Sequence, residues 1–313
     1  MSSSAPLVSV CVPLYNHANY FPECIESVIG QTYQNIELIV IDDGSSDASL
    51  KVAEGYVDRC EKRFVRFELR SRNNKGLCAT LNEALEWCSG DYFSPVASDD
   101  AWFSQKVDSQ VVAFSELKKK YDIGAIFGEV VRVDQYNKNI GWHTNYDGDV
   151  VFYDFFDVYF GRAYVSAPTA MMDMRLVKDI GGYPEDVFIE DFYMWLSITS
   201  KGHLLAKQNT KVARYRVHGD NASLILNKMN GEKVKLLKQF SRSDDDFERA
   251  KKSRLGRDFL YVAINDRKQA WGMVLRREVD LFELRNFAYF LIMLFPPLGS
   301  PLFIRTLKKI TGR

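Results

Sequence analysis

The sequence predicts an α/β fold in which a mostly parallel, twisted sheet is flanked by helices. Over the first hundred residues, short apolar runs of strand length alternate with segments of helical periodicity, in the order βαβαβαβ. Chains that alternate in this way form parallel sheets whose faces are covered by the helices. Polar residues follow each of the four apolar runs, which is typical of a ligand site beyond the carboxyl ends of the strands.

The N-terminal part supplies these elements in turn. The predicted strands are Leu7–Leu14, Ile36–Asp42, Phe64–Leu69 and Tyr92–Ala97. Helices are expected over 22–30, after the turn 44–47, and along an apolar stripe formed by Leu77, Leu81, Ala84, Leu85 and Cys88. Because Ser and Asp are favoured N-caps, one of them is expected to cap the helix after residue 47.

The rest of the chain is mixed and then helical. Further strands are expected over Ile123–Val133, Ser166–Met172 and Lys211–Val217, with a helix from Asp191 to Ser200. From about residue 224 the pattern becomes helical and charged, over 230–240 and 244–254. We therefore expect two domains, an α/β domain over residues 1–222 and a helical C-terminal region over residues 223–313.

Composition narrows the class of protein. Lys+Arg and Asp+Glu are both 41, so the net charge is zero and nothing indicates a nucleic-acid partner. The five cysteines are odd in number and lack the paired spacing of metal sites, which favours free thiols in a reducing cytosol. The N-terminus has no basic segment before its apolar run, so we interpret that run as a strand rather than a signal peptide and expect a cytoplasmic protein.

The polar residues after the predicted strands suit a nucleotide and a cation. They are Tyr15 after the first strand, Asp43 after the second, Arg72 and Asn74 after the third, and Asp99 and Asp100 after the fourth. A carboxylate can accept the N3–H of uracil or thymine, and a tyrosine ring can stack on the base. Paired carboxylates bind Mg²⁺ or Mn²⁺, which can bridge two phosphates.

Each of these groups also has a simpler interpretation. Asp43 and the Asp99–Asp100 pair could be turn residues or helix caps, and Arg72 could lie in a solvated loop. The occurrence of polar residues at all four strand ends argues against that interpretation for the group as a whole. The sequence has no G-x-G-x-x-G, which counts against a dinucleotide oxidoreductase, and no G-x-x-x-x-G-K-[ST], which excludes a P-loop enzyme. It also lacks the glycine-rich loop expected of a nucleotidyltransferase.

Several motifs together resemble the family 2 glycosyltransferases, which are inverting enzymes of the GT-A fold. The resemblance covers about residues 6–220 and is most specific in Val8–Asn16, Cys24–Thr32 and Ile36–Asp47. It continues through Asn74–Gly76, Asn82, Ser89–Tyr92 and Ser98–Asp100, and resumes at Gly181–Glu185, Glu190–Asp191 and Tyr215–His218. The resemblance implies a GT-A nucleotide-binding domain that uses a UDP- or dTDP-sugar and a divalent metal, Mn²⁺ or Mg²⁺.

The resemblance also assigns roles to individual residues. Asp43 corresponds to the carboxylate that reads the base, with Pro13 and Tyr15 beside it, while Asp99 is close to the ribose or the metal. Asp100 corresponds to the metal ligand and Asp191 to the general base. Ala97 replaces the first Asp of the longer D-x-D-D form found in many members, which leaves the metal geometry open.

Several alternatives remain open. His218 could contact the diphosphate or the metal, or be an ordinary loop histidine, and His17 shows no partner pattern and is expected to be structural or solvated. The chain could be an inactive nucleotide-sugar-binding scaffold rather than an enzyme, or, less favoured, a nucleotidyltransferase.

Family members commonly build cell-surface polysaccharides or glycolipids, so a saccharide or lipid-linked saccharide acceptor is expected. The apolar run Phe287–Phe295 and the basic residues after Arg305 could bind the inner face of the plasma membrane peripherally or, equally, the run could be a core helix.

Overall fold

The computed structural model describes residues 5–141, 149–219, 221, 225–265, 267–276, 278–279 and 284–294. The chain divides into two compact units. The first comprises Met1–Val158 and Ala163–Asn221, and the second comprises Tyr159–Arg162 and Ala222–Arg313. The boundary near residue 221 falls where the sequence pattern changes from mixed to helical.

Four parallel strands form one half of the sheet in the first unit. They are β1 (Val8–Leu14), β2 (Ile36–Asp42), β3 (Arg66–Ser71) and β4 (Tyr92–Pro95), arranged side by side in the order β3-β2-β1-β4. All three pairings between them are parallel, as predicted. Strand β3 begins two residues later than predicted because Phe64 and Val65 lie in the turn and pairing starts at Arg66.

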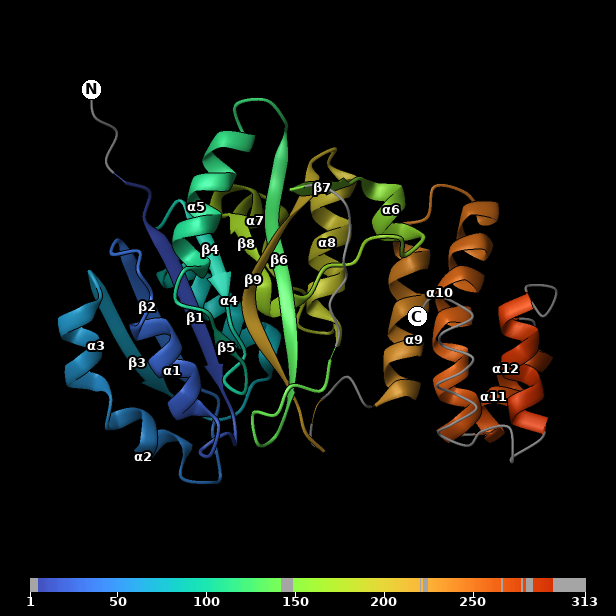
Figure 1. Ribbon diagram of the computed structural model, residues 1–313, viewed down its shortest axis with the longest axis horizontal. Coiled ribbons are helices and arrows are strands. Elements are labelled where there is room, and N and C mark those ends of the chain that lie inside the picture. The colour runs from blue at the N-terminus through green and yellow to red at the C-terminus, as the bar shows by residue number, and fades with distance from the viewer. Residues whose placement is uncertain are drawn as a thin grey trace. The chain divides into compact units, whose positions relative to one another are not determined.

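The other half of the sheet contains longer and shorter strands. It contains β5 (Ala101–Trp102), β6 (Ile123–Asp134), β7 (Val150–Tyr153), β8 (Met171–Asp173) and β9 (Leu204–Val217). The long pairing of β6 with β9 is parallel, whereas the short strands β5, β7 and β8 pair antiparallel. The described sheet is therefore mixed but mostly parallel, as Figure 1 shows.

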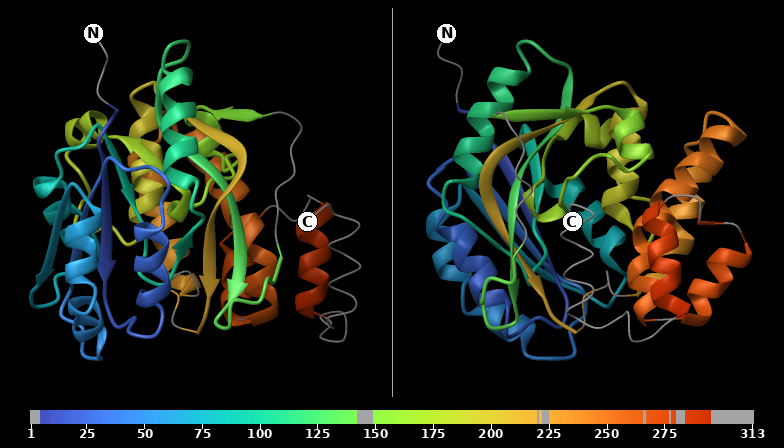
Figure 2. Two further views of the ribbon diagram at one scale, coloured as in Figure 1. Left: turned by 60° about the vertical axis from the view of Figure 1, so that its left-hand side comes forward. Right: turned by 45° about the vertical axis from the view of Figure 1, so that its right-hand side comes forward.

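Helices cover both faces of this sheet (Figures 1 and 2). They are α1 (Phe21–Ile29), α2 (Ser49–Glu54), α3 (Val57–Arg63), α4 (Leu77–Trp87), α5 (Lys106–Leu117), α7 (Met174–Ile180) and α8 (Glu190–Ser200). Alternate residues of β1, such as Val10 and Val12, share a core with α1 and α5. Because successive strand residues point to opposite faces, Cys11 lies on the other face, where α4 packs on β1 and β2.

Three local predictions are corrected by the structure. Residues 166–172 are not one strand: Ala167–Thr169 forms a 3₁₀ turn, because Pro168 cannot donate to a ladder, and only β8 follows. Strand β9 begins at Leu204, seven residues before the predicted start at Lys211. Helix α2 has Ala48 rather than Ser or Asp as its N-cap, although the Asp47 carboxylate accepts the Ser49 N–H at 2.9 Å.

The second unit is helical, as its sequence pattern predicts. It contains α9 (Leu226–Gln239), α10 (Asp244–Asn265), α11 (Arg267–Leu275) and α12 (Leu284–Leu294), while α6 (Phe155–Tyr159) spans the boundary between the units. The hydrophobic core of the second unit includes Phe259 and Tyr289. Within the described residues, no helix is both long and apolar enough to cross a membrane. Phe295 and the basic residues from Arg305 onward lie outside the described part.

Candidate active site

The first part of the site lies where β1 and β2 end. Leu14 is in register with Asp42, and the Asp43 N–H donates to the Leu14 carbonyl at 2.8 Å. Tyr15 follows directly and is 47% exposed, so its ring is accessible for stacking. Pro13 is partly buried within β1, in register with Ile41. The predicted base-contacting residues are thus adjacent at one edge of the sheet.

Asp43 is held by the loop that follows β3. Its Oδ1 accepts from the Arg72 guanidinium and from the Lys75 N–H at 2.7 Å, and its Oδ2 accepts from the Gly76 N–H at 2.9 Å. A carboxylate has about four acceptor positions, so these three donors leave one, on Oδ2. Asp43 is only 4% exposed and does not cap α2.

The same loop contains two further predicted residues. Arg72 donates to Glu83 at 2.7 Å and to Thr80 at 2.8 Å as well as to Asp43, so it is fixed rather than solvated. Asn74 lies against Gly44, where an added Cβ would be 2.7 Å from the Asn74 nitrogen. Gly44 also has a φ of 71°, so a side chain there would be strained as well as too close. The structure therefore brings Asp43, Arg72 and Asn74 together.

The second part of the site lies beyond β4, where Asp99 and Asp100 play different roles. The Oδ2 atom of Asp99 is 2.9 Å from Nε2 of His218, and the Asn221 amide donates to it at 3.4 Å. Asp100 instead accepts the backbone N–H of Arg216 at 2.8 Å through Oδ1. Burial and the neighbouring Asp99 charge raise the pKa of Asp100 well above its usual range. Neither carboxylate caps α5, whose N-cap is Gln105.

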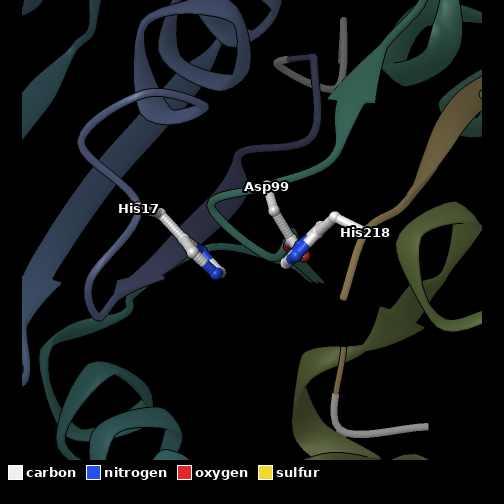
Figure 3. Close-up of side chains that lie close together, drawn as sticks. All are labelled: His17, Asp99 and His218. Atoms are coloured by element: carbon white, nitrogen blue, oxygen red, sulfur yellow. The ribbon is translucent and has the colours of Figure 1, made fainter. Parts of the chain in front are cut away.

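His17, which the sequence leaves as structural or solvated, lies beside this second part. Its Nδ1 is 2.8 Å from the Ser98 hydroxyl oxygen, and its ring centroid is 5.7 Å from that of His218. Figure 3 shows the side chains of His17, Asp99 and His218 pointing toward one another. One ligand atom from each of the three lies within 4.8 Å of the others. Among the described residues these three form a candidate metal-binding group, and Asp100 is not part of it.

One distance in this group is compatible with a shared divalent cation. Around an octahedral ion with bonds of about 2.1 Å, adjacent ligand atoms are about 3.0 Å apart and opposite ones about 4.2 Å apart. The 2.9 Å separation of Asp99 Oδ2 and His218 Nε2 is close to the adjacent spacing. The carboxylate and imidazole ligands suit Mn²⁺ better than an all-oxygen site would. The residues that could bind a metal are therefore Asp99 and His218, with His17 beside them.

The third part is the start of α8. Glu190 and Asp191 are its first two residues, and Ile189 is its N-cap. The Asp191 Oδ1 accepts the Phe192 N–H at 2.6 Å. Burial and the Asp191 charge raise the pKa of Glu190 to about 8, so Glu190 is mainly protonated at neutral pH.

The segment before α8 is tied to α4, which begins beside Asp43. The Asn82 amide donates to the Tyr183 carbonyl at 2.7 Å and accepts the Tyr183 N–H at 2.8 Å. The Cys78 thiol donates to the Val187 carbonyl at 3.3 Å. These contacts hold the segment that leads to Asp191 against the first half of α4. The sequence alone did not indicate this role of Asn82, because the two partners are 101 residues apart.

Comparison with known proteins identifies the fold and the family of this chain. Residues 9–181, more than half of the chain, match the model of glycosyl transferase family 2. The S. aureus TarS 1–349 structure in complex with UDP-GlcNAc superposes with a TM-score of 0.63 at 17% identity, covering 84% of this chain and 77% of that one. A Pyrobaculum calidifontis mannosyltransferase in complex with GDP-Man and Mn²⁺ gives a TM-score of 0.58 at 16% identity, covering 93% and 85%. The fold is thus GT-A-like, and the chain belongs to glycosyl transferase family 2.

Curated relatives agree at the sequence level. The putative glycosyltransferase EpsE of Bacillus subtilis is 36% identical over 121 residues, which cover 39% of this chain and 42% of EpsE. The chondroitin synthase of Escherichia coli is 27% identical over 226 residues, covering 70% of this chain and 30% of the synthase. An uncharacterized glycosyltransferase of Rickettsia typhi is 36% identical over 116 residues, covering 37% of this chain and 34% of the relative. This chain spans about a third or less of the length of the first curated relatives.

Proposed function

We propose that this protein is a metal-dependent, inverting glycosyltransferase that moves a sugar from a UDP- or dTDP-sugar to an acceptor hydroxyl. We assign catalysis to residues 1–222. The observation that carries the proposal is the placement of Asp43 after β2 and the Asp99–His218 pair after β4, on either side of β1. A nucleoside diphosphate laid across this edge would have its base at Asp43 and its phosphates at Asp99 and His218.

The remaining acceptor position of Asp43 supports a uracil or thymine base. The N3–H of either base is a single donor, which matches the one position left on Oδ2. Guanine presents two adjacent donors, and cytosine presents an acceptor at N3, so both match less well. Tyr15 supplies the exposed ring for stacking, with Pro13 beside it, while Arg72 and Asn74 fix the loop that orients Asp43.

Asp99 and His218 are the residues that we propose hold the cation. We favour Asp99 over the sequence-based choice of Asp100, because Asp99 lies next to His218 whereas Oδ1 of Asp100 accepts the Arg216 N–H. Bound Mn²⁺ or Mg²⁺ supplies Lewis-acid stabilisation of the departing diphosphate. Asp100 then acts by fixing the backbone of Arg216, two residues before His218.

Asp191 is the proposed general base. It would remove the proton from the acceptor hydroxyl as that oxygen attacks the anomeric carbon on the face opposite the diphosphate, which inverts the configuration. Its position in the first turn of α8 favours its ionised form, because the helix N-terminus stabilises negative charge. The raised pKa of Glu190 makes Glu190 the less readily ionised carboxyl group of the two.

The proposed setting is synthesis of a cell-surface polysaccharide or glycolipid, with a saccharide or lipid-linked saccharide as acceptor. The similarity to chondroitin synthase over 70% of this chain supports a polysaccharide product. We propose a cytoplasmic enzyme in peripheral contact with the inner face of the plasma membrane. Phe287 and Leu294 of α12 are exposed, which supports that contact, whereas Tyr289 of the same helix is buried in the core of the second unit.

A donor screen tests the proposal. The full chain is incubated with UDP-, dTDP- and GDP-sugars, each with Mn²⁺, Mg²⁺ or EDTA, and thermal stabilisation and donor hydrolysis are measured. A ligand present at about 100 times its Kd stabilises the folded state by about 2.7 kcal/mol, which shifts the melting temperature measurably. UDP- or dTDP-sugars should stabilise the protein and be hydrolysed in the presence of metal. Stabilisation without turnover by any donor and acceptor would instead support an inactive scaffold.

A further inference from the structure

We infer that His17 is a third protein ligand of the cation, and that its imidazole gives the site a preference for Mn²⁺ over Mg²⁺. The inference rests on the proposed function, because it concerns the cation that we place at Asp99 and His218. It starts from the fact that His17, on the loop after β1, reaches a group formed by residues about 80 and 200 positions away in the chain.

The backbone around His17 is held in place on both sides. Asn16 has a positive φ of 53°, and its side-chain oxygen accepts the Ser46 N–H at 2.8 Å. The N–H of His17 donates to the Ser49 hydroxyl at 2.8 Å, and the N–H of Ala18 donates to Asp47 at 3.1 Å. A residue in this left-handed conformation costs free energy unless its surroundings fix it, so the loop is built to hold His17 in one place.

The His17 ring is also oriented. Its Nδ1 is 2.8 Å from the Ser98 hydroxyl, and Ser98 is buried directly before Asp99. Histidine ligands in proteins bond a metal through one ring nitrogen while the other is hydrogen-bonded to an oxygen, which fixes the ring. With Nδ1 next to Ser98, we expect the metal bond to form at Nε2 of His17. One ring nitrogen of His17 lies within 4.8 Å of ligand atoms of Asp99 and His218, so one ion could reach all three residues with small side-chain adjustments.

The kind of ligand sets the expected selectivity. Mg²⁺ prefers oxygen ligands and retains water, whereas imidazole nitrogen binds first-row transition metals more strongly. Asp99 and His218 alone would give one oxygen and one nitrogen, and His17 adds a second nitrogen. Loss of the His17 nitrogen should therefore weaken Mn²⁺ binding more than Mg²⁺ binding.

Metal binding to the full chain tests this inference without reference to turnover. Mn²⁺ affinity is measured by electron paramagnetic resonance with and without UDP, Mg²⁺ affinity by competition, and nitrogen ligation by electron spin echo modulation. His17→Phe keeps a planar ring but removes the ligand, and His203→Phe is the matched control, since His203 pairs with Asp122 outside the group. We expect His17→Phe to weaken Mn²⁺ about tenfold or more, to change Mg²⁺ affinity less than about threefold, and to reduce the coordinated imidazoles from two to one.

The outcomes separate failure of this inference from failure of the proposed function. If wild-type protein binds Mn²⁺ with one imidazole, or if His17→Phe binds Mn²⁺ as wild type does, His17 is not a ligand although the metal site stands. If Mn²⁺ and Mg²⁺ affinities fall equally, His17 acts only by positioning the Ser98 loop, and the inference is overturned. If wild-type protein binds neither metal nor UDP, the proposed function itself fails. Melting temperatures confirm that each variant is folded.

Discussion

Replacing Asp191 with Asn separates catalysis from helix stability. The Oδ1 atom of Asp191 accepts the Phe192 N–H at 2.6 Å, and an Asn side chain keeps an oxygen in that position. What is lost is the negative charge in the first turn of α8, which contributes about 0.3–1 kcal/mol. A loss of about 1 kcal/mol lowers the melting temperature of a domain of this size by about 2–4 °C. If Asp191 only stabilised the helix, this small shift would be the whole effect.

A general base predicts a much larger effect on the reaction. Removing a positioned base costs about 10²- to 10⁴-fold in turnover, equivalent to about 3–5 kcal/mol in the barrier. The affinity for UDP should stay within about twofold of wild type, because Asp43, Asp99 and His218 are unchanged. The assay measures kcat and KM for sugar transfer, UDP affinity by calorimetry, and the melting temperature of the same preparation.

Glu190→Gln is the matched control. Because Glu190 is mainly protonated at neutral pH, Gln replaces one neutral group with another, and turnover at pH 7 should fall by no more than a few-fold. The reasoning is refuted if Asp191→Asn turns over near the wild-type rate, or if Glu190→Gln is inactive at pH 7 while Asp191→Asn is not. In either case Glu190 or another group would be the base.

The remaining predictions concern stability, donor and metal binding, and the membrane. Because the pKa of Glu190 is raised in the folded protein, burial of Glu190 increasingly destabilises the fold as pH rises from about 5 to about 9. The melting temperature of Glu190→Gln minus that of wild type should therefore grow over this range. A constant difference would contradict the raised pKa. Asp43→Ala should weaken UDP binding by about 1–3 kcal/mol in calorimetry, and unchanged affinity would remove Asp43 as the base-reading group. EDTA should abolish sugar transfer, and Mn²⁺ or Mg²⁺ should restore it. Asp99→Asn should lose more metal affinity than Asp100→Asn. The reverse order would identify Asp100 as the metal ligand. A form ending near residue 284 should bind anionic liposomes less than the full chain, and equal binding would contradict the membrane contact.

The parallel half of the sheet was predictable because its sequence signals are local. Buried parallel strands have continuous apolar runs, and the β2 prediction, Ile36–Asp42, matches the structure at both ends. The edge at which Asp43 and Asp99 gather follows from the same pattern, since the carboxyl ends of parallel strands lie together. His17 could have been included by this argument, because it follows β1 by three residues, but a lone histidine carries no pattern of its own.

The second half of the sheet was harder to predict because its charges are paired over long distances. The first part of β9 contains Lys207, which interrupts the apolar pattern expected of a buried strand. In the structure Lys207 is buried at 2.9 Å from Glu129 on β6, so opposite charges on neighbouring strands neutralise each other. Such pairing depends on the register of β6 against β9, which one sequence does not reveal. The short strands likewise depend on distant partners: β5 and β7 pair with β9, and β8 pairs with β4 and β6.

Arg216 shows how the site can tolerate buried charge. Its side chain is almost fully buried, yet its guanidinium donates to the Asp99 carbonyl at 2.9 Å, to the Asn137 side chain at 2.7 Å and to Glu23 of α1. Asn137 in turn donates to Glu23 at 2.9 Å, so the donors and acceptors satisfy one another across four separate segments of the chain. A buried ion pair rarely adds stability over apolar packing, so this network is better explained by what it positions. It anchors the backbone at Asp99 and the end of β9, the strand that leads directly to His218.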